Sequence, residues 1–191
     1  MNNEKTKTIA ESITLLISNE LIVINEKELI NKLAPFLSQN YIKSLYNEQK
    51  NYFCFPLTID KNSFELFCTF LMYPSQIDFY KLINLKKLID ICLFLNAFSI
   101  ITQLTEEGKY IKPDINNCIE IVNLFLDYIY IKNETVKNIF IKIIQETLIY
   151  IAKNLIELIN TKLEELYSLN VETLEEIIEL YFKYEIGRAH V

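Results

Sequence analysis

The stretch from Glu134 to Leu166 contains neither glycine nor proline. Those two residue types interrupt helices most often, so the stretch is expected to be helical almost throughout. Its apolar residues recur at a helical spacing, at Ile139, Ile143, Leu148, Ile151, Leu155 and Leu158. Because one uninterrupted helix of this length is unusual in a small domain, we expect a break near Asn154 or Asn160.

Helical patterning extends well beyond this stretch. From Leu82 onward, one face is formed by Leu85, Leu88, Ile89, Cys92, Leu95 and Phe98. Gly108 and Pro113 then bracket a loop, which is the best candidate for a domain boundary. Asp114 or Asn116 can cap the helix that follows, whose apolar face is formed by Ile119, Val122, Phe125, Leu126 and Ile129. A last helix should follow Asn170, with an inward face of Leu174, Ile177, Ile178 and Tyr181.

Residues 1–80 mix strands with helices. Residues 13–17 and 21–24 are two apolar runs joined by a short polar turn, which predicts a hairpin. A helix is expected at 26–37, with Pro35 ending or kinking its last turn. Residues 52–59 are a third strand candidate, in which Pro56 indicates an edge strand or a strand end. A helix at 63–72 should follow, capped from Asp60–Ser63 and stopped by Tyr73-Pro74-Ser75.

Composition excludes several classes of protein. The net charge is −6 and there is no basic tract, which is unfavourable for binding nucleic acid. The first residues lack the apolar region of a signal peptide, and no apolar run is long enough to span a membrane. The irregular spacing of the four cysteines predicts reduced, buried thiols of a cytoplasmic protein, with the nucleus as an alternative compartment.

The last six residues, 186–191, read IGRAHV and break the preceding helical pattern. One reading frame of a widely used sequencing adapter translates to this hexapeptide. We therefore expect the hexapeptide to be read-through, and the authentic chain to continue beyond Glu185. A genuine tail is the alternative.

Without that hexapeptide, the chain has no histidine and a single glycine, Gly108. It can form no Ser–His or Cys–His nucleophile pair and no histidine metal site. One glycine cannot build a phosphate-binding loop. The glutamates lie in helical runs typical of solvated helix faces. We therefore expect no enzyme activity, no catalytic or metal-binding residue and no cofactor.

Several short segments, in order, resemble the BTB/POZ domain and the helical BACK segment that can follow it. Residues 13–26 (ITLLISNELIVINE) are similar to the strand pair that opens many BTB domains. Further similarities lie at 29–36, 62–77 and 88–97, which match the helices of that domain. Residues 117–121 (NCIEI) resemble the start of a BACK segment, and residues 151–155 (IAKNL) and 166–177 (LYSLNVETLEEI) resemble its later parts.

The resemblance implies an α+β fold with a BTB/POZ-like domain at 1–108, a small sheet flanked by helices. An all-α BACK-like segment would follow at 114–185. It also implies a protein–protein adaptor of the kind that bridges a cullin-3 ubiquitin-ligase scaffold to its substrate. Cullin contact in the family often uses an apolar-x-Glu element, and Tyr46-Asn47-Glu48 fits it, so Tyr46 and Glu48 are the candidate contacts.

Three alternatives remain open. One is a homo-oligomerisation or scaffold module unrelated to ubiquitination. A homodimer is an expected partner arrangement in the family, but the arm before Ile13 is shorter than the one exchanged in many BTB dimers. A second alternative is a Skp-like adaptor, against which the NCIEI segment argues. An enzyme is the third.

Overall fold

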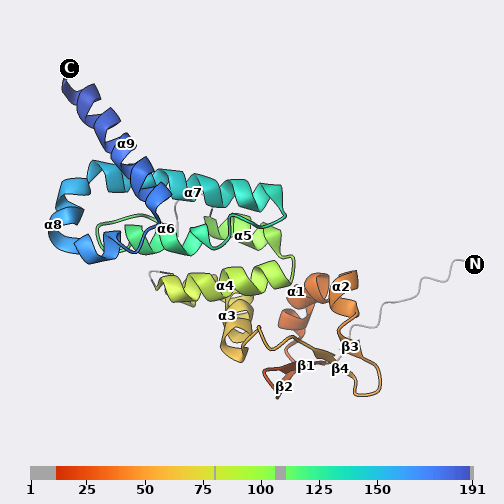
Figure 1. Cartoon of the computed structure of the whole chain (residues 1–191). Helices are drawn as coiled ribbons and strands as arrows, with labels where there is room; N and C mark the ends of the chain where they lie inside the picture. The colour runs from red at the N-terminus through yellow and green to blue at the C-terminus, as the bar shows by residue number, and fades with distance from the viewer. Residues whose placement is uncertain (1–11, 80, 106–110, 190–191) are drawn as a thin grey trace, which may run out of the picture. The chain divides into compact units, whose positions relative to one another are not determined.

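The computed structural model describes residues 12–79, 81–105 and 111–189 (Figure 1). It has an α+β fold, with a small four-stranded sheet and a predominance of helix. The chain divides into two compact units, Met1–Phe98 and Ser99–Val191. This division lies earlier than the boundary predicted at 108–114. Gly108, on which that prediction depended, lies outside the described residues.

The sheet contains β1 (Ile13–Ile17), β2 (Glu20–Ile24), β3 (Tyr46–Asn47) and β4 (Tyr52–Cys54), in the order β2-β1-β4-β3. The predicted hairpin of β1 and β2 is confirmed, with Ile13 opposite Ile24 and Ile17 opposite Glu20. Its turn residues Ser18 and Asn19 have φ of 50° and 65°. Two consecutive positive φ values suit a tight hairpin, because they match the twist of the flanking strands.

The third predicted strand is only partly right. Pro56 was predicted to indicate either an edge strand or a strand end. β4 ends at Cys54, just before Pro56, so the second alternative is confirmed. The other interpretation, an edge strand, is wrong, because β4 pairs in parallel with β1 and antiparallel with β3. The chain leaves the sheet after Phe55, whose N–H donates to the carbonyl of Leu16 at 2.9 Å. Strand β3 was not predicted.

The helices of the first unit are α1 (Lys27–Leu37), α2 (Asn40–Lys43), α3 (Lys61–Met72), the 3-10 turn η1 (Pro74–Gln76) and α4 (Leu82–Phe94). Helix α3 begins at Lys61, two residues before the predicted start, and its predicted cap is confirmed. Asp60 accepts from the N–H of Ser63 at 2.9 Å, which satisfies one of the free donors of the first turn. Pro35 lies inside α1, close to its C-terminal end. The sheet and these helices enclose an apolar core that includes Leu15, Leu33 and Phe67, all fully buried.

The second unit is helical: α5 (Phe98–Thr105), α6 (Cys118–Leu126), α7 (Glu134–Lys153), α8 (Leu155–Leu166) and α9 (Val171–Ala189). The predicted break near Asn154 is confirmed, since α7 ends at Lys153. Helix α7 packs against both α6 and α9 (Figure 1). The predicted apolar face running from Leu85 to Phe98 is divided between α4 and α5, because Asn96 adopts a φ of 50° and ends α4.

Two predicted faces need correction. The buried residues of α7 include Val136, Phe140 and Ile144, whereas Ile139 and Ile143 are only half-buried. This part of α7 is apolar on most sides, so the sequence alone does not show which face is buried. In the structure the ring of Phe140 packs against that of Phe125 in α6. On α9, Ile177 is buried as predicted, but Ile178 is 48% exposed and was wrongly placed inward.

The hexapeptide at 186–191 lies partly in α9, whose backbone stays helical to Ala189. The helix therefore does not stop at Glu185. The adapter origin of these residues stays a prediction, because a helical backbone is compatible with either origin.

Candidate protein-contact site

The two predicted contact residues, Tyr46 and Glu48, lie in one hairpin formed by β3 and β4. Tyr46 is in the strand, opposite Phe53, and Glu48 is in the connecting turn. Phe53 is in turn opposite Leu15 of β1. Residues opposite one another share a face of the sheet, so the hairpin is continuous with the buried core through Leu15.

The Tyr46 side chain is held at its ring and at its hydroxyl group. The ring centroid lies 5.0 Å from that of Phe53, and the hydroxyl donates a hydrogen bond to Oδ1 of Asn51. Tyr46 is nevertheless 39% exposed. An aromatic side chain that is already ordered loses little conformational freedom when a partner covers it.

The turn that carries Glu48 is built by asparagines. Asn47 Oδ1 accepts from the N–H of Lys50 at 3.0 Å, and Asn51 has a φ of 56°. Asparagine tolerates the left-handed region and caps turns through its side chain. Glu48 is exposed, and Lys50 lies 5.9 Å from the ring of Tyr52. The turn between β3 and β4 therefore carries exposed charges of both signs, close in sequence to Tyr46.

A second exposed aromatic residue, Tyr41 of α2, was missed by the sequence analysis. It is 51% exposed, and its ring makes an edge contact with Phe94 at 5.8 Å. Phe94 contacts Phe55 at 5.1 Å, and Phe55 contacts Phe64 at 5.8 Å. The nearby β3 could have been anticipated from the polar run between Tyr46 and Tyr52, which is typical of a turn between two aromatic strand residues.

The side chain of Gln39 fixes the segment that carries Tyr41. Its Nε2 donates to the carbonyl of Leu95 at 2.9 Å, and its Oε1 accepts from Nδ2 of Asn96 at 3.1 Å. Just after Tyr41, the side chain of Ile42 is fully buried. The segment is thus anchored by polar bonds to the end of α4 and by an apolar side chain in the core. Together with the hairpin it presents ordered aromatic rings rather than a flexible loop.

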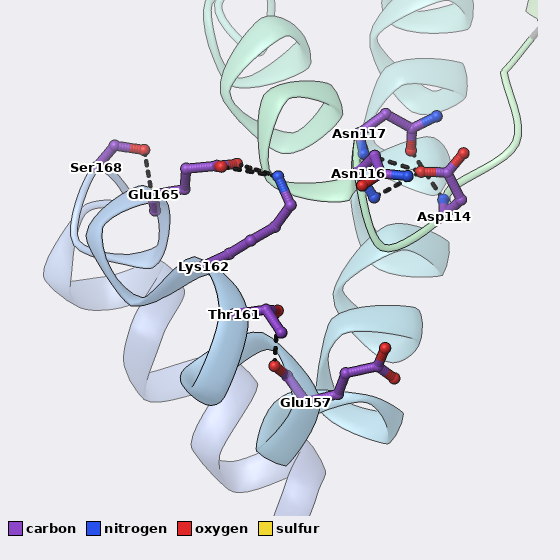
Figure 2. A network of polar contacts seen from close by, with 8 residues as sticks. All are labelled: Asp114, Asn116, Asn117, Glu157, Thr161, Lys162, Glu165 and Ser168. Carbon is purple, nitrogen blue, oxygen red and sulfur yellow. Dashed lines mark hydrogen bonds and ion pairs between the residues drawn. The ribbon is translucent and has the colours of Figure 1, made fainter.

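A separate polar cluster lies in the second unit (Figure 2). Lys162 Nζ lies 2.7 Å and 2.9 Å from the two carboxylate oxygens of Glu165. Nearby, Asp114 Oδ1 accepts from the N–H groups of Asn116 and Asn117, at 2.7 Å and 3.0 Å. Asp114 therefore orders the turn before α6, but the N-cap of that helix is Asn117, without a side-chain capping bond, so neither predicted cap is confirmed. These bonds are local and structural: they order the turn and the kink at Lys162, where φ is −139°.

The cysteines are all free, and two of the four are less buried than predicted. Cys92 and Cys118 are buried, whereas Cys54 and Cys68 are half-buried. Burial raises the pKa of the Cys68 thiol to about 12 and that of Cys118 to about 11, and it raises the pKa of Cys92 further still. A thiol with a raised pKa stays protonated at neutral pH and is a poor nucleophile.

Within the described residues, no group of three or more histidine, cysteine, aspartate or glutamate side chains could hold a metal ion. None of the helices in those residues has the length and apolar character needed to cross a membrane. No known protein family model, curated protein or solved structure matches the chain. The structure is therefore that of a helix-rich α+β protein. Its best-formed candidate site is the hairpin of Tyr46 and Glu48, and Tyr41 of α2 is a further exposed and ordered aromatic residue.

Proposed function

We propose that the protein is a non-enzymatic protein–protein interaction adaptor, resembling the substrate adaptors of cullin-3 ubiquitin ligases. One observation carries this proposal: Tyr46 is substantially exposed, yet its ring and its hydroxyl are both held in place. Pre-ordered aromatic residues are typical anchors of protein interfaces, where they supply a large share of the binding free energy.

The proposed contact combines that anchor with a charged rim. A partner groove would cover the ring of Tyr46, while Glu48 would pair with a basic group at the edge. Tyr41 extends the same kind of surface from α2, since it too is exposed and supported by a buried ring system. In this division of roles, truncating the tyrosine should raise the dissociation rate constant. Reversing the glutamate charge should mainly lower the association rate constant and change its salt dependence.

The test is binding of the purified chain to the amino-terminal region of a cullin-3-type scaffold, measured by surface plasmon resonance. The Tyr46→Ala and Glu48→Lys variants should each weaken binding by about tenfold or more. Matched controls are Tyr130→Ala and Glu120→Lys, which change an exposed tyrosine and an exposed glutamate in the second unit. Equal binding by all five proteins would reject the site. No binding by the wild-type chain would reject the cullin partner.

A second candidate function, homomeric association, is favoured by the edge strand β2. In the sheet order β2 lies at one end, and its Leu21 and Val23 are 60% and 57% exposed. An apolar edge strand is a template for pairing with another strand. Light scattering after size exclusion would give a dimer mass for the wild type and a monomer mass for Val23→Lys. A monomeric wild type would exclude this function.

A further inference from the structure

Helix α9 carries apolar residues on two different sides. On one side Ile177 is 1% exposed, and this side packs against α7 (Figure 1). Tyr184 lies seven residues, or about two turns, after Ile177. Nζ of Lys153 in α7 is 4.9 Å from the centroid of its ring. On another side, about a third of a turn away, Val171, Ile178 and Phe182 are 66%, 48% and 58% exposed.

The three exposed side chains form one line. Ile178 and Phe182 follow Val171 at spacings of two and three helical turns, because a turn contains about 3.6 residues. Single exposed apolar residues are common on protein surfaces, whereas a line of them along a helix is typical of a helix–helix seam. The line is about 16 Å long at a rise of about 1.5 Å per residue, which is enough for two to three turns of a second helix.

Glutamates follow one flank of that line. Glu172, Glu175 and Glu179 are all exposed. More widely, residues 155–185 carry eight glutamates and two lysines, a net charge of −6 that equals the net charge of the whole chain. The rest of the protein is therefore balanced in charge, and its acidity is concentrated in the segment that forms α8 and α9.

This charge distribution selects among the occupants that an apolar seam could accept. A second copy docked through the same face would bring glutamates close to glutamates, and like charges at an interface are unfavourable. An anionic membrane surface or a nucleic acid would be repelled for the same reason. A helix with basic flanking residues would gain from both the apolar line and the acidic flank.

We propose that the outer face of α9 is a docking surface for a basic amphipathic helix of a partner protein. The apolar side of that helix would cover Val171, Ile178 and Phe182. Its lysines or arginines would lie opposite Glu172, Glu175 and Glu179. This surface is distinct from the hairpin of Tyr46 and Glu48, so it does not depend on the adaptor function proposed above.

The experiment uses the full chain and two synthetic helical peptides labelled with a fluorophore. Both carry leucine at the seam positions, and the flanking positions are lysine in one peptide and glutamate in the other. Anisotropy titrations should show binding of the lysine peptide, weakened by high salt, and at least roughly tenfold weaker binding of the glutamate peptide. Equal binding of the two peptides would overturn the proposal.

Substitutions in α9 distinguish binding of the lysine peptide at this surface from non-specific electrostatic attraction to an acidic protein. Ile178→Ser/Phe182→Ser tests the apolar line, and Glu175→Gln/Glu179→Gln tests the acidic flank. Each should weaken binding of the lysine peptide by about tenfold. The matched control Tyr130→Ser/Glu120→Gln changes exposed residues of α6 and the segment after it, and should stay within about twofold.

Two outcomes would refute the surface. One is an equal loss of binding in the control and in the α9 variants, which would show that the peptide does not bind specifically to this face of α9. The other is concentration-dependent dimerisation of the wild-type chain that Phe182→Ser abolishes, which would identify a second copy as the occupant. Circular dichroism melts of each variant check that the fold is retained, as expected for substitutions of exposed residues.

Discussion

The hydroxyl of Tyr46 donates a hydrogen bond to the side chain of Asn51, at the far end of the turn that connects β3 to β4. Asn51 is also the residue of this turn with a positive φ, 56°. One side chain therefore both fixes the exposed tyrosine and allows the turn to close. The shape of the proposed contact surface depends on this pair.

Substitutions of Asn51 should separate its two roles. Asn51→Gly keeps the backbone conformation and removes the hydrogen bond, so it should lower the free energy of unfolding by no more than about 1 kcal/mol. Asn51→Val also forces a β-branched residue into the left-handed region, which should cost about 1–2 kcal/mol more. Urea denaturation followed by circular dichroism measures both. Equal stability of the two variants would contradict the assigned backbone role.

The cap of α3 should make a pH-dependent contribution to stability. The pKa of Asp60 is lowered from 3.8, first by the hydrogen bond from the Ser63 hydroxyl and also by backbone N–H groups. Since the folded-state pKa is depressed, this contribution is present above about pH 4 and is lost as the pH falls through the folded value. Asp60→Ala should cost about 1 kcal/mol at neutral pH.

Asp60→Asn is the matched control, because asparagine also caps helices but does not titrate. The difference in unfolding free energy between wild type and Asp60→Asn should shrink below about pH 4. Urea midpoints measured across acidic pH would show this. If this difference stays constant with pH, ionisation of the Asp60 carboxylate does not contribute to the stability of the fold.

Ionisation of the Cys68 and Cys118 thiols should destabilise the fold at alkaline pH. Cys68 and Cys118 have folded-state pKa values of about 12 and about 11, against an ordinary value of 9.0. Between the ordinary and the folded values the unfolded chain releases a proton that the folded chain retains. Stability is therefore fully present below about pH 9 and is lost as the pH rises toward about 11 or 12.

The variants Cys68→Ala and Cys118→Ala test whether these thiols cause the loss of stability at alkaline pH. The quantity to compare is the change in the free energy of unfolding with pH, not its value at one pH. Each variant should lose less stability than the wild type between pH 8 and pH 10.5, compared by urea denaturation under reducing conditions; these two pH values lie to either side of the ordinary thiol pKa of about 8.5–9. Parallel pH curves for all three proteins would show that these thiols are not responsible.

The ring of Phe140 should be the most sensitive position between α6 and α7. It is fully buried, and its centroid lies 5.1 Å from Phe125 and 5.5 Å from Tyr128. Phe140→Ala should lower the free energy of unfolding by about 3–5 kcal/mol, through lost burial and the cavity left behind. Phe140→Leu retains most of the volume and should cost clearly less. Calorimetry measures the loss of unfolding free energy in both variants. A similar loss for Phe140→Ala and Phe140→Leu would contradict the importance of this packing.

Local signals in the sequence predicted much of the backbone. The β1–β2 hairpin, the cap of α3 at Asp60 and the break at Asn154 depend on residues close in the chain: a polar turn, a capping carboxylate and an asparagine that ends a helix. These signals act over a few residues. They do not depend on which other element packs nearby, so one sequence suffices to find them.

The site was predicted less completely. Tyr46 and Glu48 were chosen through a resemblance in pattern, and their contact role stays a prediction. The bond from Tyr46 to Asn51 and the ring series behind Tyr41 were not predicted. The contact of Tyr41 joins α2 to Phe94 in α4, far along the chain. No spacing rule connects residues so distant, because their proximity arises only after the helices pack.

By itself, the sequence determined the α+β character, the positions of most helices and the concentration of glutamates toward α8 and α9. These follow from periodicity, capping chemistry and charge, which are local properties. The tertiary structure alone decided which face of an all-round apolar helix is buried. Phe140 rather than Ile139 enters the core of the second unit, and Ile178 remains exposed beside the buried Ile177. The physical reason is that burial depends on shape complementarity with a neighbouring helix, and an apolar residue is equally able to take either role.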